Sequence, residues 1–176
     1  MKKILTFGGS NSKNSISRTL AKHLGKKLGN FDIEDIDLND FELPLYSIDR
    51  EQEFGFPENA KLLDDKLSST DGIIIVLAEH NGAYSAVFKN MFDWLSRING
   101  EVWKQKPMLL LSTSPGVRGG ESVLEIAKNR FPRNGGNIVG SMTFPNFNDN
   151  FKNGEIVNTA LESEIISLLN DLRKEL

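Results

Sequence analysis

The sequence predicts an α/β fold in which helices cover both faces of a five-stranded parallel β-sheet. Strand-like and helix-like patterns alternate five times along the 176 residues, which is typical of parallel strands joined by right-handed helical crossovers. Residues 73–77 and 107–111 are apolar throughout, as expected for strands buried on both faces of a sheet. Segments rich in glycine and serine follow three of the strands, at the sheet edge where ligands bind in such folds.

Size and composition agree with this fold. The length suits one domain, which we expect to span residues 1–176. An apolar content of 39% and a charged content of 26% are ordinary for a globular protein. The net charge of -3 argues against nonspecific binding to DNA or RNA, because such binding requires a basic surface. We therefore expect no nucleic-acid partner.

The chain contains no cysteine, which excludes disulfides, thiolate nucleophiles and thiolate metal sites. Its two histidines are His23 and His80, so a zinc site would have to be built mostly from carboxylates, which is unusual. We expect no metal and no catalytic side chain. Redox chemistry in this chain would have to be carried by a bound cofactor.

The first apolar run ends at Phe7 and is too short for a secretory signal. No segment approaches the ~18 consecutive apolar residues of a transmembrane helix. We therefore expect a cytoplasmic protein that makes no contact with a membrane.

The elements follow from hydrophobic patterning and from helix-stop signals. Strands are predicted over residues 3–7, 32–37, 73–77, 107–111 and 138–144. Apolar residues at helical spacing predict helices over residues 16–28, 57–68, 87–98, 121–131 and 159–172. Gly29 ends the first of these helices, and Pro132 stops the fourth.

Two further segments carry specific expectations. Residues 39–57 are polar and hold two prolines, so we expect one long loop that serves as a lid or wall. The last helix begins with Thr159 and Glu162 at capping-box spacing. Its predicted buried face consists of Leu161, Ile165, Leu168, Leu169 and Leu172.

The first special loop, residues 8–17, joins a strand to a helix and reads GGSNSKNSIS. A helix N-terminus has unpaired N–H groups and a partial positive charge, so it attracts anions. Serines and asparagines add donors here, and Lys13 and Arg18 add positive charge. Because the loop has neither a P-loop ending nor GxGxxG, a monophosphate fits best. The alternative is that the loop only caps the helix, although one cap needs one such residue.

The second loop, residues 78–84, reads AEHNGAY. Asn81-Gly82 favours a tight turn that lets backbone amides face a ligand, and His80 and Tyr84 offer flat rings for stacking. An ordinary turn with a surface histidine is the alternative. The third loop, residues 112–120, also leads into a helix and presents free amides. Its alternative is a flexible connection in which Arg118 is solvated.

The shared position of the three loops supports a ligand-binding role for each of them. In an open α/β sheet, ligands bind at the carboxyl ends of the strands where the strand order reverses, and FMN does so in the flavodoxin-like order 2-1-3-4-5. In that order strands one, three and four are neighbours, and these are the strands that the three loops follow. We therefore expect a flavodoxin-like three-layer sandwich with FMN at this edge.

The loop sequences resemble the NAD(P)H-dependent FMN reductase family, which includes azo, quinone and chromate reductases. The family pattern Gly-Ser-x-Arg-x-x-Ser-x-Asn is similar to residues 9–17. The pattern Pro-Glu-Tyr-Asn-Gly-Ser-Tyr is similar to residues 78–84, and the helix that follows carries matching Lys-Asn and Asp-Trp-Leu-Ser segments at residues 89–90 and 93–96. A Ser-Pro-Gly-x-x-Gly-Gly loop matches residues 114–120.

The resemblance implies an enzyme that passes hydride from NADPH or NADH through FMN to a quinone, an azo compound, free flavin or a metal oxyanion. It implies that Ser10, Ser15 and Ser17 hold the FMN phosphate, that residues 79–82 line the flavin ring, and that residues 114–119 lie near its pyrimidine side. The complete implied set is Ser10, Asn11, Ser12, Ser15, Ile16, Ser17, Glu79, His80, Asn81, Gly82, Ser114, Pro115, Gly116, Arg118 and Gly119.

A homodimer or homotetramer, with the ring near a subunit interface, is also implied by the resemblance. Phe92 and Trp94 are candidates either for that interface or for the core. The chain departs from the family pattern where Ser12 replaces the usual arginine and Ser17 the usual asparagine. His80 likewise stands where the family has tyrosine.

Three other functions are compatible with parts of the sequence. A flavodoxin-like electron carrier would be more acidic than this chain. A non-enzymatic flavin-binding redox protein would use the same loops. A serine esterase with Gly9-Ser10 as its nucleophile motif would need a histidine base near the carboxyl end, where neither histidine lies.

Overall fold

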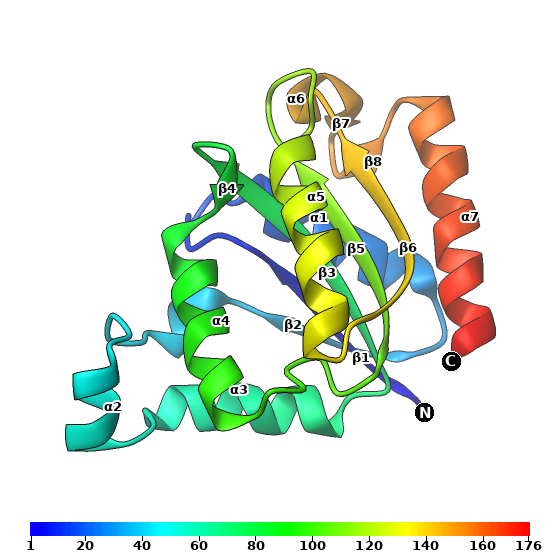
Figure 1. Cartoon of the computed structure of the whole chain (residues 1–176). Coiled ribbons are helices and arrows are strands. Elements are labelled where there is room, and N and C mark those ends of the chain that lie inside the picture. The colour runs from blue at the N-terminus through cyan, green and yellow to red at the C-terminus, as the bar shows by residue number, and fades with distance from the viewer.

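The computed structural model describes all 176 residues and is organised around a parallel sheet. The strands lie in the order β2-β1-β3-β5-β6, and each neighbouring pair is parallel (Figure 1). These strands are β1 (Lys3–Gly8), β2 (Asp32–Ile36), β3 (Gly72–His80), β5 (Pro107–Thr113) and β6 (Asn137–Phe144). Taken along the chain, they are the five predicted strands in the predicted order, so the flavodoxin-like class is confirmed.

Helices cover both faces of this sheet, as Figure 1 shows. One face is covered by α1 (Ile16–Leu28) and α7 (Thr159–Glu175). The opposite face is covered by α3 (Glu58–Ser69), α4 (Ala86–Ile98) and α5 (Glu121–Arg130). No helix in the structure combines the length and apolar composition that a membrane crossing requires.

The apolar run in β3 divides its side chains between the two faces. Ile74 and Val76 pack with α1 and α7, whereas Ile73, Ile75 and Leu77 pack with α3, α4 and α5. All five side chains are at most 1% exposed. The run is uninterrupted because successive strand residues point to opposite faces and both faces are covered.

One short strand, β4 (Ala83–Tyr84), is not predicted by the sequence and pairs antiparallel with the end of β3. Glu79 lies opposite Tyr84, and His80 lies opposite Ala83. The expectation that a loop begins at residue 78 is therefore wrong. The hairpin pairs the backbone groups that would otherwise belong to a loop, so β3 continues to His80.

The expectation of one long loop over residues 39–57 is also wrong in part. The 3₁₀-helix η1 (Leu38–Phe41) and the helix α2 (Ile48–Phe54) occupy much of it. Ser47 caps α2 by accepting a hydrogen bond from the backbone N–H of Arg50 at 3.2 Å. Helix α2 buries none of its side chains, so its sequence has no apolar stripe by which it could have been recognised.

The last part of the chain adds small elements that the sequence does not predict. They are α6 (Phe147–Asn150), β7 (Phe151–Lys152) and β8 (Glu155–Ile156), together with η2 (Phe131–Asn134), which continues from α5 through Pro132. The predicted capping box is wrong, because Asn158 caps α7 instead of Thr159. Its Oδ1 accepts hydrogen bonds from the N–H groups of Ala160 and Leu161 at 3.1 and 3.2 Å.

The buried face of α7 is narrower than predicted. Ile165, Leu169 and Leu172 are buried, whereas Leu161 and Leu168 are partly exposed. Phe92 and Trp94 of α4 are 5% and 0% exposed, which gives both of them the core role that the sequence left open.

Candidate functional site

The first loop is anchored to the neighbouring strand and to helix α4. The N–H of Gly9 donates to the carbonyl oxygen of Val76 at 2.8 Å, and the carbonyl oxygen of Gly9 accepts from the Ser85 hydroxyl at 2.6 Å. Ser85 is buried and also caps α4 by accepting from the N–H of Phe88. The loop after β1 is thereby held against the start of α4.

Serines shape the interior of this loop. Ser10 Oγ accepts from the N–H of Ser12 at 3.1 Å, and Ser15 Oγ accepts from the N–H of Arg18 at 3.1 Å. Ser15 is therefore the cap of α1, as the capping alternative requires. Its hydroxyl also lies 2.9 Å from that of Ser17, and both side chains are buried. Capping thus explains one serine but not the rest of the loop.

Several backbone N–H groups of the loop donate to no atom of the protein. They belong to Ser10, Asn11, Lys13, Ile16 and Ser17. The last two open helix α1, where the helix dipole adds partial positive charge. Unpaired donors around a helix N-terminus are the arrangement that binds a phosphate group. The structure therefore fits FMN phosphate at this loop by backbone donors.

Arg18 does not serve the loop as the sequence suggested. Its guanidinium binds Asp35 at 2.7 Å and also pairs with Asp37, so it ties α1 to the end of β2. Partial burial would raise the pKa of Asp37, but hydrogen bonds from Asn39 and the charge of Arg18 lower it overall. Positive charge at the loop is left to Lys13, which is exposed and forms no ion pair.

The second loop is the tight turn between β3 and β4. Asn81 and Gly82 have φ angles of 53° and 75°, so both adopt the positive φ of a type I′ hairpin turn. His80, Asn81 and Gly82 are exposed at the edge of the sheet. Their surfaces are free to meet a flat ligand.

Tyr84 does not present its ring to that edge. It is half-buried, and its ring lies 5.2 Å from that of Phe88 and 6.4 Å from the nearly parallel ring of Phe131. Burial raises the pKa of Tyr84 to about 12, and its hydroxyl has no hydrogen-bond partner. His80 is therefore the ring that remains available for stacking.

Glu79 makes a contact that sequence reasoning missed. Its Oε2 accepts a hydrogen bond from the backbone N–H of Val123 at 2.9 Å, in the first turn of α5. The cap residue of α5 is Gly120, which has no side chain to accept such a bond. A sequence signal for this contact existed. The helix begins after two glycines and has no serine, threonine, asparagine or aspartate at its cap, so its first N–H groups need an acceptor from another part of the chain.

The third loop is fastened to the segment after β6. The N–H groups of Asn146 and Phe147 donate to the carbonyl oxygens of Gly116 and Ser114 at 2.9 and 3.1 Å. Gly119 has a φ of 59°, and a Cβ there would lie 2.8 Å from the backbone nitrogen of Pro145. Only glycine fits that position without a shift of the backbone.

The middle of the third loop faces solvent, whereas Ser112, Thr113 and Gly120 at its ends are buried. Pro115, Gly116 and Arg118 are exposed, and Ser114 is partly exposed. Arg118 forms an exposed ion pair with Glu121, its Nε lying 3.2 Å from Oε2. Arg118 is therefore solvated, as the alternative interpretation of this loop expected. It still lies at the rim of the candidate site.

The three loops form one edge because contacts join them in series. Gly9 connects the first loop to β3 and α4, and Glu79 connects the hairpin to α5 and hence to the third loop. The predicted residues of all three loops lie at the carboxyl ends of β1, β3 and β5, which are neighbours in the sheet. Their assignment to a ligand stays a prediction.

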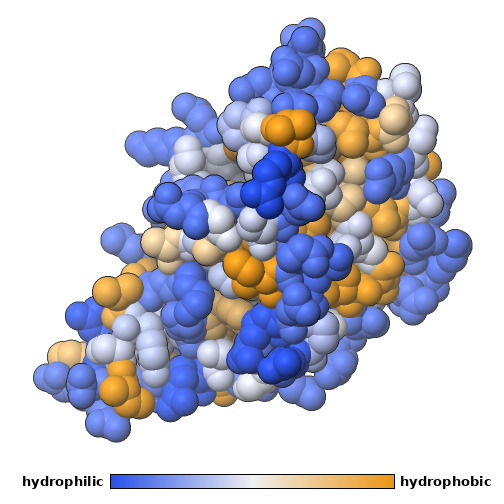
Figure 2. All heavy atoms as spheres, turned by 45° about the horizontal axis from the view of Figure 1, so that its top comes forward, coloured by the Kyte–Doolittle hydropathy of each residue, from blue (hydrophilic) through white to orange (hydrophobic).

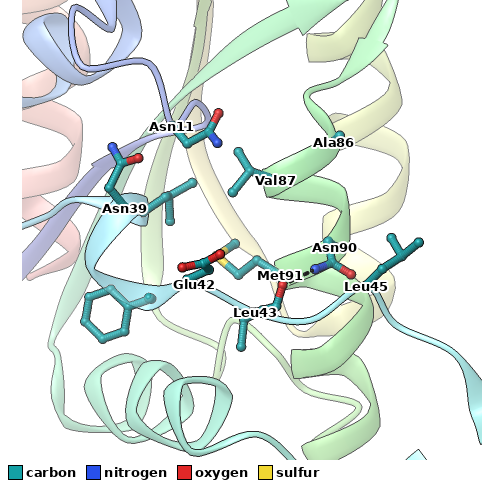
Figure 3. A pocket seen from close by; sticks show the side chains of 11 residues that line it. Asn11, Asn39, Glu42, Leu43, Leu45, Ala86, Val87, Asn90 and Met91 are labelled. Atoms are coloured by element: carbon teal, nitrogen blue, oxygen red, sulfur yellow. Dashed lines mark hydrogen bonds between the residues drawn. The ribbon is translucent and has the colours of Figure 1, made fainter. Parts of the chain in front are cut away.

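A pocket beside this edge was not predicted as part of the site. Its volume is about 500 Å³, and Asn11 is the one predicted site residue that lines it (Figure 3). The other walls come from residues 38–45 and from the first turns of α4. The sequence pointed to this pocket in one respect only, because residues 39–57 were expected to form a lid or wall.

Comparisons with known proteins point in the same direction as this geometry. The family model described as NADPH-dependent FMN reductase matches residues 2–149. The chain is 34% identical over 147 residues to the uncharacterized protein MG342 homolog of Mycoplasma pneumoniae, covering 81% of this chain and 86% of that one. It is 39% identical over 79 residues to the quinone reductase of Escherichia coli, covering 45% of this chain and 42% of that protein.

Among solved structures, the fold is similar to FerB, a flavoenzyme NAD(P)H:(acceptor) oxidoreductase from Paracoccus denitrificans. The TM-score is 0.76 at 26% identity, and the match covers 99% of each chain. The similarity therefore extends over the sheet, its helices and all three loops.

Proposed function

Because this chain belongs to the NADPH-dependent FMN reductase family, we propose that it is an FMN-dependent oxidoreductase that transfers reducing equivalents from NAD(P)H to a quinone or a flavin. The observation that carries the proposal is the group of unpaired backbone donors in the loop between β1 and α1. This group is matched to a monophosphate, and it stands at the sheet edge where the strand order reverses.

The phosphate would be bound mainly by backbone groups. Ile16 and Ser17 supply N–H groups at the start of α1, and Ser10 and Asn11 supply two more from the loop. The hydroxyls of Ser10 and Ser12 already accept one hydrogen bond each, so their protons are free to be donated. Phosphate binding here depends on backbone geometry more than on charged side chains.

The ring would lie over the hairpin and the third loop. The exposed backbone at His80, Asn81 and Gly82 offers a surface for it, and His80 offers stacking. Backbone N–H groups at Gly116 and Arg118 have no partner in the protein and can stabilise negative charge on the pyrimidine edge. The chemistry that FMN supplies is hydride acceptance from NAD(P)H followed by two-electron transfer to the acceptor.

Several acceptors are compatible with this arrangement. The proposal extends to azo compounds and metal oxyanions, because His80, Asn81 and Gly82 are exposed and the edge that they form does not enclose the acceptor. An electron carrier or a non-enzymatic flavin protein would use the same loops but would not turn over NAD(P)H. Family membership favours the enzyme over both of these.

The decisive experiment is spectroscopic and kinetic. The purified protein is mixed with FMN, and its visible spectrum is recorded before NADH or NADPH oxidation is followed with menadione. We expect a bound-flavin spectrum and steady-state turnover. A protein that binds no FMN contradicts the site, and one that binds FMN without oxidising either donor favours the carrier or the non-enzymatic protein.

The assembly is also a proposal. We propose that residues 1–176 form one domain and that two or four copies associate through the region of α2. Leu45, Ile48 and Phe54 are 76%, 47% and 72% exposed there, and Figure 2 shows apolar residues on the surface at that end of the molecule. Light scattering would test this assembly, and a purely monomeric protein contradicts it.

A cytoplasmic location and the absence of a nucleic-acid partner remain predictions from composition.

A further inference from the structure

The pocket beside Asn11 has no role in the FMN site described above. Its volume of about 500 Å³ lies within the roughly 300–1,000 Å³ of small-molecule sites. Figure 3 shows Asn11, Asn39 and Val87 around its upper rim, with Glu42 and Met91 below them. Because Asn11 lies between two serines of the phosphate loop, the pocket begins where the proposed phosphate site ends.

The walls of the pocket are apolar on two sides. Val87 and Met91 come from α4, and Leu38, Phe41 and Leu43 come from η1 and the segment after it. Such walls suit a flat ring system that enters between a helix and a loop.

Three polar side chains remain able to bind a ligand. The side chain of Asn11 and the carboxylate of Glu42 make no hydrogen bond with the protein. Asn39 donates from Nδ2 to Asp37 at 2.8 Å, but its amide oxygen accepts no bond. The ionised carboxylate of Glu42 can only accept hydrogen bonds from a ligand, whereas the amides of Asn11 and Asn39 can both donate and accept, since Asp37 uses only one of the two Nδ2–H groups of Asn39.

Asn90 has a different role in the same pocket. Its Oδ1 accepts from the N–H of Tyr46 at 2.8 Å, and its Nδ2 donates to the carbonyl oxygens of Leu43 and Pro44 at 3.3 and 3.1 Å. Trp94 Nε1 adds a bond to Pro44 at 2.7 Å. These contacts hold the segment carrying Glu42 against α4, so the pocket is formed before a ligand binds.

The charge of the pocket disfavours a phosphate group beside Glu42. No lysine or arginine lines it, and Glu42 contributes a carboxylate. A ligand that matches it has hydrogen-bond donors and no phosphate at that point. A quinone offers only carbonyl acceptors, whereas adenosine offers an exocyclic amine and two ribose hydroxyls.

We propose that this pocket binds the adenosine half of the nicotinamide donor, and that Glu42 selects NADH over NADPH. The proposal rests on the proposed function. A carboxylate accepts hydrogen bonds from ribose hydroxyls and repels the 2′-phosphate of NADPH, as acidic residues do in other dinucleotide sites. Asn11 and Asn39 complete the set of polar partners.

The first test measures binding without turnover. ADP-ribose and its 2′-phosphate are titrated calorimetrically into the FMN-loaded protein. We expect ADP-ribose to bind about tenfold more tightly than the 2′-phosphate, and Glu42→Gln to reduce that ratio to about threefold or less. Glu58→Gln is the matched control, because Glu58 is an exposed glutamate of α3 outside the pocket. It should leave the ratio unchanged.

The second test fills the pocket and measures donor preference. Val87→Trp should abolish ADP-ribose binding while the flavin spectrum is retained. In steady state, kcat/KM should favour NADH over NADPH by about tenfold, and Glu42→Gln should reduce this preference by the same factor as the binding ratio.

The outcomes separate this inference from the proposed function. Equal binding of the two ligands, or an unchanged ratio in Glu42→Gln, overturns the pocket assignment. A protein that reduces menadione with both donors but does not bind ADP-ribose contradicts the pocket alone. A protein that binds ADP-ribose with the expected ratio but reduces nothing supports the pocket and contradicts the proposed function.

Discussion

Glu79, at the end of β3, accepts a hydrogen bond from the backbone N–H of Val123 at 2.9 Å. The two residues are 44 positions apart in the chain, and their contact joins the hairpin to the first turn of α5. A side chain from a neighbouring strand thus takes the place of a local helix cap. The bond therefore links the second loop to the helix that follows the third loop.

Replacing Glu79 should separate its structural role from its charge. Glu79→Ala leaves the start of α5 uncapped, and we expect a loss of about 1 kcal/mol in the free energy of unfolding and weaker FMN binding. Glu79→Gln keeps an acceptor oxygen and should recover most of both. Urea unfolding and flavin fluorescence titration measure them.

Glu125→Ala is the control, because Glu125 lies on the exposed side of α5. It should change stability by less than about 0.5 kcal/mol. Equal stability of Glu79→Ala and the wild type would show that the bond to Val123 does not cap the helix.

Ser12→Arg should strengthen FMN binding. Ser12 is exposed in the phosphate loop, where the family pattern has arginine, so a guanidinium can reach a bound phosphate without displacing buried atoms. One charge-assisted hydrogen bond would lower the FMN dissociation constant about tenfold, and high salt would reduce the gain. Ser12→Gln, which has similar reach without charge, is the comparison variant. An equal gain in both variants would contradict the electrostatic explanation.

Arg18→Ala should destabilise the protein without weakening FMN binding by more than a factor of about two. The substitution removes the guanidinium from the partly buried carboxylates of Asp35 and Asp37 and leaves them with Lys22 and Asn39 as their remaining partners, so we expect a cost of about 1–3 kcal/mol. The loss should shrink at low pH, as the carboxylate of Asp37, whose pKa is lowered in the folded protein, becomes protonated. A large loss of FMN affinity in a folded variant would mean that Arg18 contacts the phosphate after all.

Tyr84 should contribute to the pH dependence of stability in alkaline solution. Its pKa is raised to about 12 by burial, above the value of 10 expected in the unfolded chain. The folded state therefore keeps a proton that the unfolded state loses, and the stabilisation present below pH 10 is lost as the pH rises through about 12.

Tyr84→Phe should remove this part of the alkaline slope. At neutral pH it should cost no stability, because the buried hydroxyl has no hydrogen-bond partner. Denaturant unfolding between pH 7 and the onset of alkaline unfolding provides the measurement. If the free energy of unfolding depends on alkaline pH in the same way in Tyr84→Phe as in the wild type, groups other than Tyr84 cause that dependence.

The strands and most of the helices were predictable because their signals are local. Both faces of β3 are covered, so consecutive residues from Ile73 to Leu77 have to be apolar. This pattern can be recognised in the local sequence. Helix α4 shows its buried face at helical spacing in the same way. Helix α2 was missed because it buries no side chain and therefore has no such pattern.

The candidate site was predictable only in part. The loop sequences located the three loops and indicated a phosphate site, since glycine and serine beside a helix start have a local physical meaning. Their contacts did not follow from the sequence. Arg18 was expected at the phosphate but lies against Asp35, and the ring of Tyr84 packs on Phe88 instead of facing a ligand.

The sequence by itself therefore determined the order of the elements, the family and the three loops. The tertiary structure decided which partner each polar side chain meets: Glu79 meets Val123, and Glu42 is left unpaired in a pocket with Asn11. The physical reason is that local patterns record burial and backbone conformation. Hydrogen bonds and pockets join residues far apart in the chain, and their geometry exists only after the sheet and its helices have packed.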